Sequence, residues 1–252
     1  MKIALLIEYD GTDFAGWQIQ PGVRTVQQEL ENAFEQVLQK RVAITSAGRT
    51  DSGVHALGMV AHVELPESFS MSIEKLTAAI NATSGHDIVV HSINEVASNF
   101  HARHSALDRE YHYTIFRRRT ALARNFSWYV RGDLDISSMK NIAVHLLGEH
   151  DFTSFSKRSD DVEHYRCTID LCEVSEEEEK IIMIIRANRF VRGMVRATVG
   201  GLVEVGRSRM TEKLFFQLLH DPTEEDRAKY LAPAEGLVFW KVRYPKEFGL
   251  WE

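Results

Sequence analysis

The loop at residues 48–56 holds the side chains best suited to chemistry. Its sequence, Gly-Arg-Thr-Asp-Ser-Gly-Val-His-Ala, places the carboxylate of Asp51 near the guanidinium of Arg49. The functional interpretation is a carboxylate held at the end of a strand, beside a fixed arginine and facing a cleft. The glycine spacing is that of a phosphate-binding loop, but Val54 and His55 stand where that loop needs Lys and Ser or Thr, which excludes it. A turn in which Asp51 hydrogen-bonds its own backbone is the simpler alternative.

Two tyrosines form the second candidate group. Tyr111 and Tyr113 share one face of a predicted strand, because side chains on a strand alternate between its two faces. The arginines at 117–119 follow, so the pair could stack on a nucleic-acid base beside a basic segment. A half-buried aromatic face of the core is the alternative.

Three arginines form the third group. If residues 190–205 are helical, Arg189, Arg192 and Arg196 lie within an arc of about 60°. Arginine suits phosphate groups because its planar fork donates two parallel hydrogen bonds. An exposed, solvated basic face is the alternative.

Neither metal chemistry nor a disulfide framework is predicted. His101 and His104 form the only closely spaced histidine pair, and no third ligand with standard spacing stands near them. Cys167 and Cys172 are the only cysteines and are expected to be thiols in a cytoplasmic protein. They are five residues apart in a strand pattern, which predicts that they face opposite sides. Neither a membrane-spanning run nor a secretory signal is present.

The charge distribution favours an anionic partner despite a formal net charge of −6. Residues 101–131 contain seven arginines and two acidic residues, and residues 186–209 contain six arginines and one acidic residue. Residues 1–100 are acidic, with twelve Asp or Glu and six Lys or Arg. A local field matters more to an anionic ligand than the total charge does. We therefore expect the two basic stretches to hold phosphates and the acidic half to face away from them. The glutamates at 176–179 predict a solvated turn.

The hydrophobic periodicity predicts the elements that must position these side chains. In the first half, the order is strand, helix, strand, strand, helix, strand, at residues 3–8, 26–38, 42–45, 59–65, 73–80 and 88–96. In the second half, strands are expected at 111–116, 165–174, 181–187 and 238–244, and helices at 135–147, 190–205 and 211–220.

This order predicts an α+β fold of two similar ferredoxin-like (βαββαβ) halves with antiparallel sheets and an active cleft between them. The expected domains are residues 1–104, which carry the Asp51 loop, and residues 105–252, which carry Tyr111 and Arg196.

The ordered set of motifs resembles the tRNA pseudouridine synthase A (TruA) family over nearly the whole chain. The segment at 48–56 is similar to the family's signature loop, which is highly specific. The other matching motifs are Tyr9-Asp10-Gly11, Gly16-Trp17-Gln18, Thr25-Val26-Gln27, Phe100-His101-Ala102-Arg103, Arg109-x-Tyr111-x-Tyr113, Gly148-x-His150-Asp151-Phe152, Phe190-x-x-x-Met194-Val195-Arg196 and Ala232-Pro233-Ala234.

The resemblance implies an isomerase that converts uridine to pseudouridine at positions 38, 39 and 40 of the tRNA anticodon stem-loop. It further implies a homodimer that binds tRNA and uses no cofactor and no metal. The family's essential aspartate corresponds to Asp51, its active-site tyrosine to Tyr111 and its active-site arginine to Arg196. The arginine that helps to displace the target base corresponds to Arg49.

Three other functions are compatible with the same residues. A non-catalytic RNA-binding protein would use the aromatic strands and basic stretches alone. A nucleoside hydrolase or glycosylase would use the same carboxylate and release free uracil. A synthase of the same family that acts on a different RNA would share every motif.

Overall fold

The chain forms an α+β structure with ten strands and five α-helices in residues 1–159 and 162–251, the part that a computed structural model describes. Most paired strands run antiparallel. The chain divides into two compact units, of which the first combines Met1–Asp108 with Phe239–Glu252 and the second is Arg109–Val238. No helix in the described part is long and apolar enough to cross a membrane.

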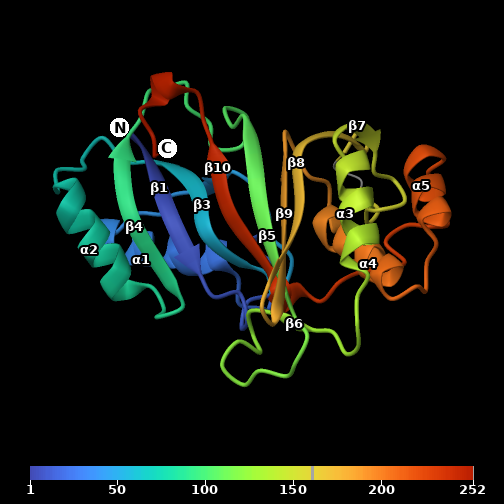
Figure 1. Ribbon diagram of the computed structural model, residues 1–252. Helices are drawn as coiled ribbons and strands as arrows, with labels where there is room; N and C mark the ends of the chain where they lie inside the picture. The colour runs from blue at the N-terminus through green and yellow to red at the C-terminus, as the bar shows by residue number, and fades with distance from the viewer. Residues whose placement is uncertain (160–161, 252) are drawn as a thin grey trace. The chain divides into compact units, whose positions relative to one another are not determined.

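The first unit is built on strands in the order β4-β1-β3-β10, and β2 pairs with β3. The helices α1 and α2 contact each other, and α2 packs on β4 (Figure 1). The bounds are β1 Lys2–Tyr9, α1 Val26–Leu38, β2 Ile44–Ser46, β3 His55–Glu64, α2 Ile73–Thr83, β4 Ile88–Glu95 and β10 Leu237–Arg243.

The helix α1 shows why these residues fold as they do. The Thr25 side chain accepts a hydrogen bond from the backbone N–H of Gln28, which caps the first turn. Leu30 and Phe34 are fully buried, so the apolar stripe of the sequence faces the core. The predicted helix and its starting residue therefore agree with the structure.

The second unit contains strands in the order β5-β9-β8-β7, with β6 paired in parallel to β5. The helix α3 packs on β8 and on α4, and α5 contacts β7 (Figure 1). The bounds are β5 Asp108–Phe116, β6 Trp128–Tyr129, α3 Ile136–His145, β7 Gly148–Asp151, β8 Arg166–Glu177, β9 Lys180–Ala187, α4 Met194–Gly206 and α5 Glu212–His220.

The helix α4 begins later than the periodicity predicts. It starts at Met194, after Gly193 in the left-handed conformation with φ of 74°. The backbone carbonyl of Arg192 instead accepts a hydrogen bond from the N–H of Lys157. Arg189 and Arg192 precede the helix, so the predicted arc of three arginines on one helical face is wrong.

The two cysteines lie on the same side of β8, contrary to the sequence prediction. Cys167 and Cys172 are both buried. The register of β8 against β9 shifts between Ile169 and Leu171, so Asp170 is an extra residue in the strand. A bulge of this kind reverses the alternation of faces, which a count of residues along a regular strand cannot include.

The C-terminal strand packs with the first unit, which differs from the predicted division at residue 104. The strand β10 hydrogen-bonds with β3. A Cβ at Gly58 in β3 would lie 2.4 Å from the carbonyl oxygen of Trp240, so only glycine permits this close approach. Arg243 also donates to both carboxylate oxygens of Asp108, at 2.6–3.0 Å. The boundary between residues 104 and 105 otherwise stays a prediction.

The first prediction concerns the packing of α4. A Cβ at Gly200 would lie 1.9 Å from the backbone oxygen of Tyr230. Gly→Ala inside a helix normally stabilises by about 1 kcal/mol, but here the added methyl forces the backbone apart. We expect Gly200→Ala to lower the melting temperature by roughly 3–10 °C, corresponding to about 1–3 kcal/mol.

Thermal unfolding followed by circular dichroism measures this change. Gly48→Ala is the matched control, because its Cβ would meet only the ring of Phe239 at 3.5 Å. An unchanged or higher melting temperature for Gly200→Ala would contradict the close packing of α4.

Candidate active site

The Asp51 loop connects β2 to β3 in the first unit. It follows Ser46, the last residue of β2, and ends at His55, the first residue of β3. Thr50 is buried, Asp51 is half-buried and Arg49 is exposed. Two strand ends therefore fix the loop, and Asp51 lies half-buried between the buried Thr50 and β3.

The segment at residues 9–17 holds the loop on the N-terminal side of Asp51. The hydroxyl groups of Tyr9 and Thr50 form a buried hydrogen bond of 2.8 Å. The backbone N–H of Trp17 donates to the carbonyl of Thr50 at 3.1 Å. Gly16 has a φ of 102°, and a Cβ there would lie 2.6 Å from the same carbonyl. These contacts leave Thr50 little freedom to move.

The same segment holds the loop on the C-terminal side of Asp51. The Ser52 hydroxyl and the Gly53 N–H both donate to the carbonyl of Phe14, at 3.1 and 3.3 Å. The N–H of Val54 donates to the carbonyl of Asp51 at 3.2 Å, which closes a tight turn around the carboxylate residue. A backbone turn is therefore present at this point, and it holds Asp51 between two fixed neighbours.

His55 contributes to the scaffold from inside the unit. Its ring is buried, and Nδ1 accepts a hydrogen bond of 2.9 Å from the N–H of Gly11. The same Nδ1 lies 3.1 Å from a carboxylate oxygen of Asp10. A Cβ at Gly11 would lie 2.0 Å from the carbonyl of Val54, so glycine is required here. His55 thus joins the start of β3 to the segment at residues 9–17.

Arg24 fixes the far end of that segment, a role that the sequence interpretation missed. Its guanidinium donates to both oxygens of Asp87, at 2.5 and 3.0 Å, and to Glu29 at 3.0 Å. It also lies 4.2 Å from the ring centroid of Phe14. Hydrogen bonding to Arg24 holds the pKa of Asp87 below its usual value. Asp87 is 63 residues away in sequence, so no local signal identifies the pair.

The second unit holds the predicted tyrosine and the predicted helical arginine. Tyr111 is nearly buried, and its ring stands edge-on to Phe190 with centroids 5.1 Å apart. Tyr113 is fully buried, and its hydroxyl donates to the carbonyl of Pro233 at 2.9 Å. Burial raises the pKa of Tyr113 well above its usual value. Tyr113 is therefore a core residue, as the alternative interpretation proposes, and Tyr111 is also buried, with 8% of its surface exposed.

Arg196 lies in the first turn of α4. Its Nε donates to the carbonyl of Ala232 at 2.8 Å, and its own carbonyl accepts from the N–H of the same residue. The positive charge of Arg196 acts on the nearby phenol of Tyr113, where it partly opposes the effect of burial on the pKa. The segment at 232–233 thus connects the arginine to the tyrosine strand.

These residues form two groups. Asp51 and Arg49 belong to one loop of the first unit, and Tyr111 and Arg196 belong to the second unit. The assembly of all four around one substrate stays a prediction. Among residues 1–159 and 162–251, no group of three or more His, Cys, Asp or Glu side chains is arranged to hold a metal ion.

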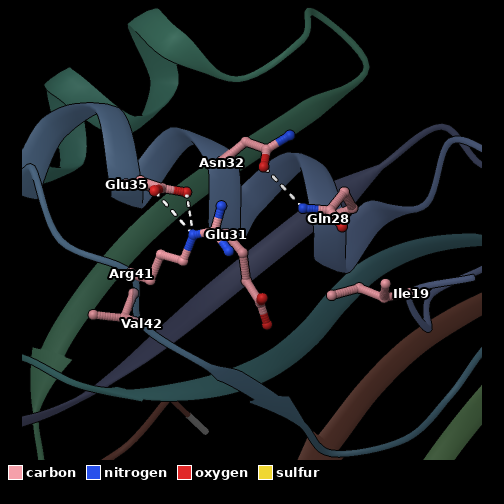
Figure 2. Close-up of a pocket in the computed structure, with 7 residues that line it drawn as sticks. All are labelled: Ile19, Gln28, Glu31, Asn32, Glu35, Arg41 and Val42. Carbon is pink, nitrogen blue, oxygen red and sulfur yellow. Dashed lines mark hydrogen bonds and ion pairs between the residues drawn. The ribbon is translucent and has the colours of Figure 1, made fainter. Parts of the chain in front are cut away.

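A surface hollow of about 340 Å³ lies beside α1 and contains none of the predicted site residues. Figure 2 shows Arg41 paired with Glu35 on one side of it. Glu31 accepts from the N–H of Ile44 at 3.0 Å and so supports the start of β2. Two glutamates make this hollow unsuited to phosphate. Its lining residues are Ile19, Gln28, Glu31, Asn32, Glu35, Arg41 and Val42.

Comparison with known proteins identifies the family. A family model described as tRNA pseudouridine synthase matches residues 5–105 and 142–245. The chain belongs to the tRNA pseudouridine synthases. It is therefore an isomerase that acts on tRNA uridine. Residues 106–141, which include Tyr111, lie between the two matched ranges.

Individual relatives match nearly end to end. The tRNA pseudouridine synthase A of Geobacter sulfurreducens is 38% identical over 96% of this chain and 99% of its own length. The protein of the same name from Methylococcus capsulatus is 42% identical over 99% of this chain and 92% of its own length. The protein of the same name from Chlorobium limicola is 41% identical over 94% of this chain and 97% of its own length.

The second prediction tests the support of the Asp51 loop. We expect Gly16→Ala to lower the kcat of pseudouridine formation by at least about tenfold with little change in KM, because misplacement of a reacting group by about 1 Å costs up to 10²-fold. The methyl group would displace Thr50, and Asp51 with it. Gly22→Ala is the control, since Gly22 also has a positive φ, of 76°, but a Cβ there meets nothing within 4 Å. Equal activities of the two variants would contradict the positioning role of this contact.

Proposed function

We propose that this synthase isomerises uridine at positions 38, 39 and 40 of the tRNA anticodon stem-loop, with Asp51 as the essential carboxylate nucleophile. One observation carries the assignment of Asp51. Its loop is fixed on both sides by the segment at residues 9–17, while Asp51 itself is only half-buried. A rigid backbone around an accessible carboxylate is the arrangement that a reacting group requires.

The reaction exchanges one bond to ribose for another. The C–N glycosidic bond breaks, the carboxylate of Asp51 takes up the positive charge that develops on the sugar, and a C–C bond to C5 of the uracil replaces the first bond. The proton on C5 is lost and a ring nitrogen gains one, so no net oxidation or hydrolysis occurs. The residues must therefore hold the released uracil while it turns.

The other three residues take complementary roles in this proposal. Tyr111 stacks on the uracil ring, and the edge-on ring of Phe190 fixes its orientation. Arg196 keeps Asp51 ionised and directed at the sugar, because a nearby positive charge favours the carboxylate. Arg49, which is exposed, occupies the space that the target base leaves when it flips out of the stack.

We also propose the finer features of the architecture. The two halves are ferredoxin-like, with the active cleft between them, and the chain acts as a cytoplasmic homodimer. The order of elements β1-α1-β2-β3-α2-β4 in the first unit supports the proposal for that half. In the second unit, β5, α3, β8, β9 and α4 occur in the order of the first five elements of the pattern, which supports the proposal for that half.

The third prediction concerns Asp51. We expect Asp51→Asn and Asp51→Ala to abolish pseudouridine formation, with a loss of at least about 10⁴-fold, and to leave tRNA binding within about threefold of wild type, because covalent participation of the carboxylate has no substitute. The assay uses unmodified tRNA, carbodiimide labelling and primer extension across the anticodon arm. Glu67→Gln, which changes an exposed carboxylate of the first unit outside the segment at residues 9–17, is the control and is expected to retain activity.

The same assay separates the competing functions. Stops at positions 38–40 in the wild type that disappear in the Asp51 variants support the proposal. Free uracil as the product would indicate a glycosylase. Binding of tRNA without any modification would indicate a non-catalytic reader, and stops elsewhere in the RNA would indicate a different target.

A further inference from the structure

The connection between β5 and β6, residues 117–127, carries an unusual surface. It leaves the end of β5 as a loop that reaches beyond the strands of the second unit (Figure 1). We call residues 117–131 the arginine loop; this range contains the connection, the strand β6 and the two residues after it. It contains five of the seven arginines of the first basic stretch. The arginine loop also lies between the two ranges that match the family model.

Two of these arginines are committed to the protein itself. Arg117 pairs with Glu176 at 2.6 Å, and Arg118 pairs with Glu179. The backbone N–H of Arg117 also donates to the carbonyl of Glu179 at 3.0 Å. The acidic run at 176–179 forms the tip of the β8–β9 hairpin, so it neutralises the start of the arginine loop in addition to making a solvated turn.

Three arginines are left for a partner. Arg119, Arg124 and Arg131 are exposed, and no carboxylate in residues 1–159 or 162–251 pairs with any of them. The guanidinium of Arg119 lies 5.8 Å from the ring centroid of Tyr129, and that of Arg124 donates to the carbonyl of Ala121. Arginines without an internal counterion are the groups with which a protein binds phosphate.

Apolar side chains stand among these charges. Leu122 is 95% exposed, Phe126 is 43% exposed and Tyr129 is 37% exposed. The backbone around them is ordered, because the Ser127 hydroxyl donates to the carbonyl of Ala123 and the N–H of Val130 donates to Phe116 in β5. The loop therefore combines exposed rings and exposed guanidinium groups on a backbone that is held at these points.

This combination identifies the kind of partner. Aromatic rings and guanidinium planes that alternate on one surface bind bases and phosphates of RNA, with the rings stacking on bases. A protein partner would select a larger apolar patch with few unpaired charges at its centre.

We propose that the arginine loop is a tRNA-docking element, in which Arg119, Arg124 and Arg131 bind backbone phosphates and Tyr129 stacks on an exposed base. The inference rests on the proposed function for the choice of RNA. It adds a binding surface whose role is affinity, separate from the chemistry of Asp51.

The fourth prediction is a loss of affinity without a loss of turnover. We expect the triple variant Arg119→Gln/Arg124→Gln/Arg131→Gln to raise the Kd for unmodified tRNA roughly 10²-fold at 0.1 M salt, and to reduce the slope of log K against log salt by about three, one for each phosphate contact. KM rises in parallel, and kcat at saturating tRNA stays within about twofold of wild type. Tyr129→Ala raises the Kd about tenfold.

Two controls make the test specific. Lys140→Gln removes one exposed positive charge from α3 in the same unit, and it measures the effect of net charge alone. Arg41→Gln/Glu35→Gln removes one paired charge of each sign from the first unit, outside the arginine loop. Both controls are expected to change the Kd by less than about threefold. The melting temperatures of all variants, measured alongside, report whether the fold is retained.

The possible outcomes are distinct. A Kd and salt slope of the triple variant that equal those of the controls would overturn the proposal, and so would a fall in kcat at saturating tRNA with an unchanged Kd. If the wild type binds tRNA through these arginines but forms no pseudouridine, the docking surface stands and the proposed reaction fails. If pseudouridine forms at the wild-type rate and affinity in the triple variant, the reaction stands and the docking surface fails.

Discussion

The immobilisation of Thr50 is the constraint on which the rest of the candidate site depends. A short loop between two strands has many accessible conformations, and each residue fixed costs about 1–2 kcal/mol of conformational entropy. Here the hydroxyl of Thr50 bonds to Tyr9, and its carbonyl bonds to the N–H of Trp17. Both partners lie in or next to β1, which is buried in the core. The rigidity of the sheet is thereby transferred to the residue that precedes Asp51.

That transfer works only if the segment at residues 9–17 is itself fixed. The segment begins at Tyr9, the last residue of β1. The chain that follows the segment is held by Arg24, which pairs with Asp87 and Glu29. Because Arg24, Asp87 and Glu29 are partly exposed, their ion pairs contribute little to the free energy of unfolding. Their value is geometric, since the planar guanidinium with two carboxylates admits one arrangement. Gly11 and Gly16 complete the constraint by allowing backbone contact that any Cβ would prevent.

Local patterns account for much of the structure. Thr25 and the apolar stripe after it predict α1, including its first residue, because capping and burial are decided within one helical turn. The exceptions arise from contacts that a local pattern does not contain. Asp170 forms a bulge that brings Cys167 and Cys172 to the same face. Gly193 takes a left-handed conformation that delays α4, since the preceding carbonyl bonds to Lys157 instead of continuing a helix.

In the candidate site, too, local patterns predict some features, and others depend on contacts between residues that are distant in sequence. Local patterns supply the candidates for the site, which are the loop around Asp51, the tyrosine strand and Arg196. Neither Arg24 nor the commitment of Tyr113 to Pro233 can be read from spacing, because their partners are 63 and 120 residues away. Sequence thus identifies groups able to react, whereas distant partners decide how each of these groups is held, as for the hydroxyl of Tyr113.

The charges follow the same rule, because contacts between distant residues decide which arginines already have an ionic partner. Counting charges along the chain treats every arginine in residues 101–131 and 186–209 as available. Arg186, however, donates to Asp170 across the strands, and Arg207 pairs with Glu204. The glutamates at the β8–β9 tip are likewise paired with Arg117 and Arg118. The electric fields of the two charges in such an ion pair largely cancel at distances beyond the screening length of about 10 Å. An approaching polyanion therefore responds mainly to the charges that lack a partner. The acidic hairpin therefore does not repel RNA as strongly as its sequence suggests.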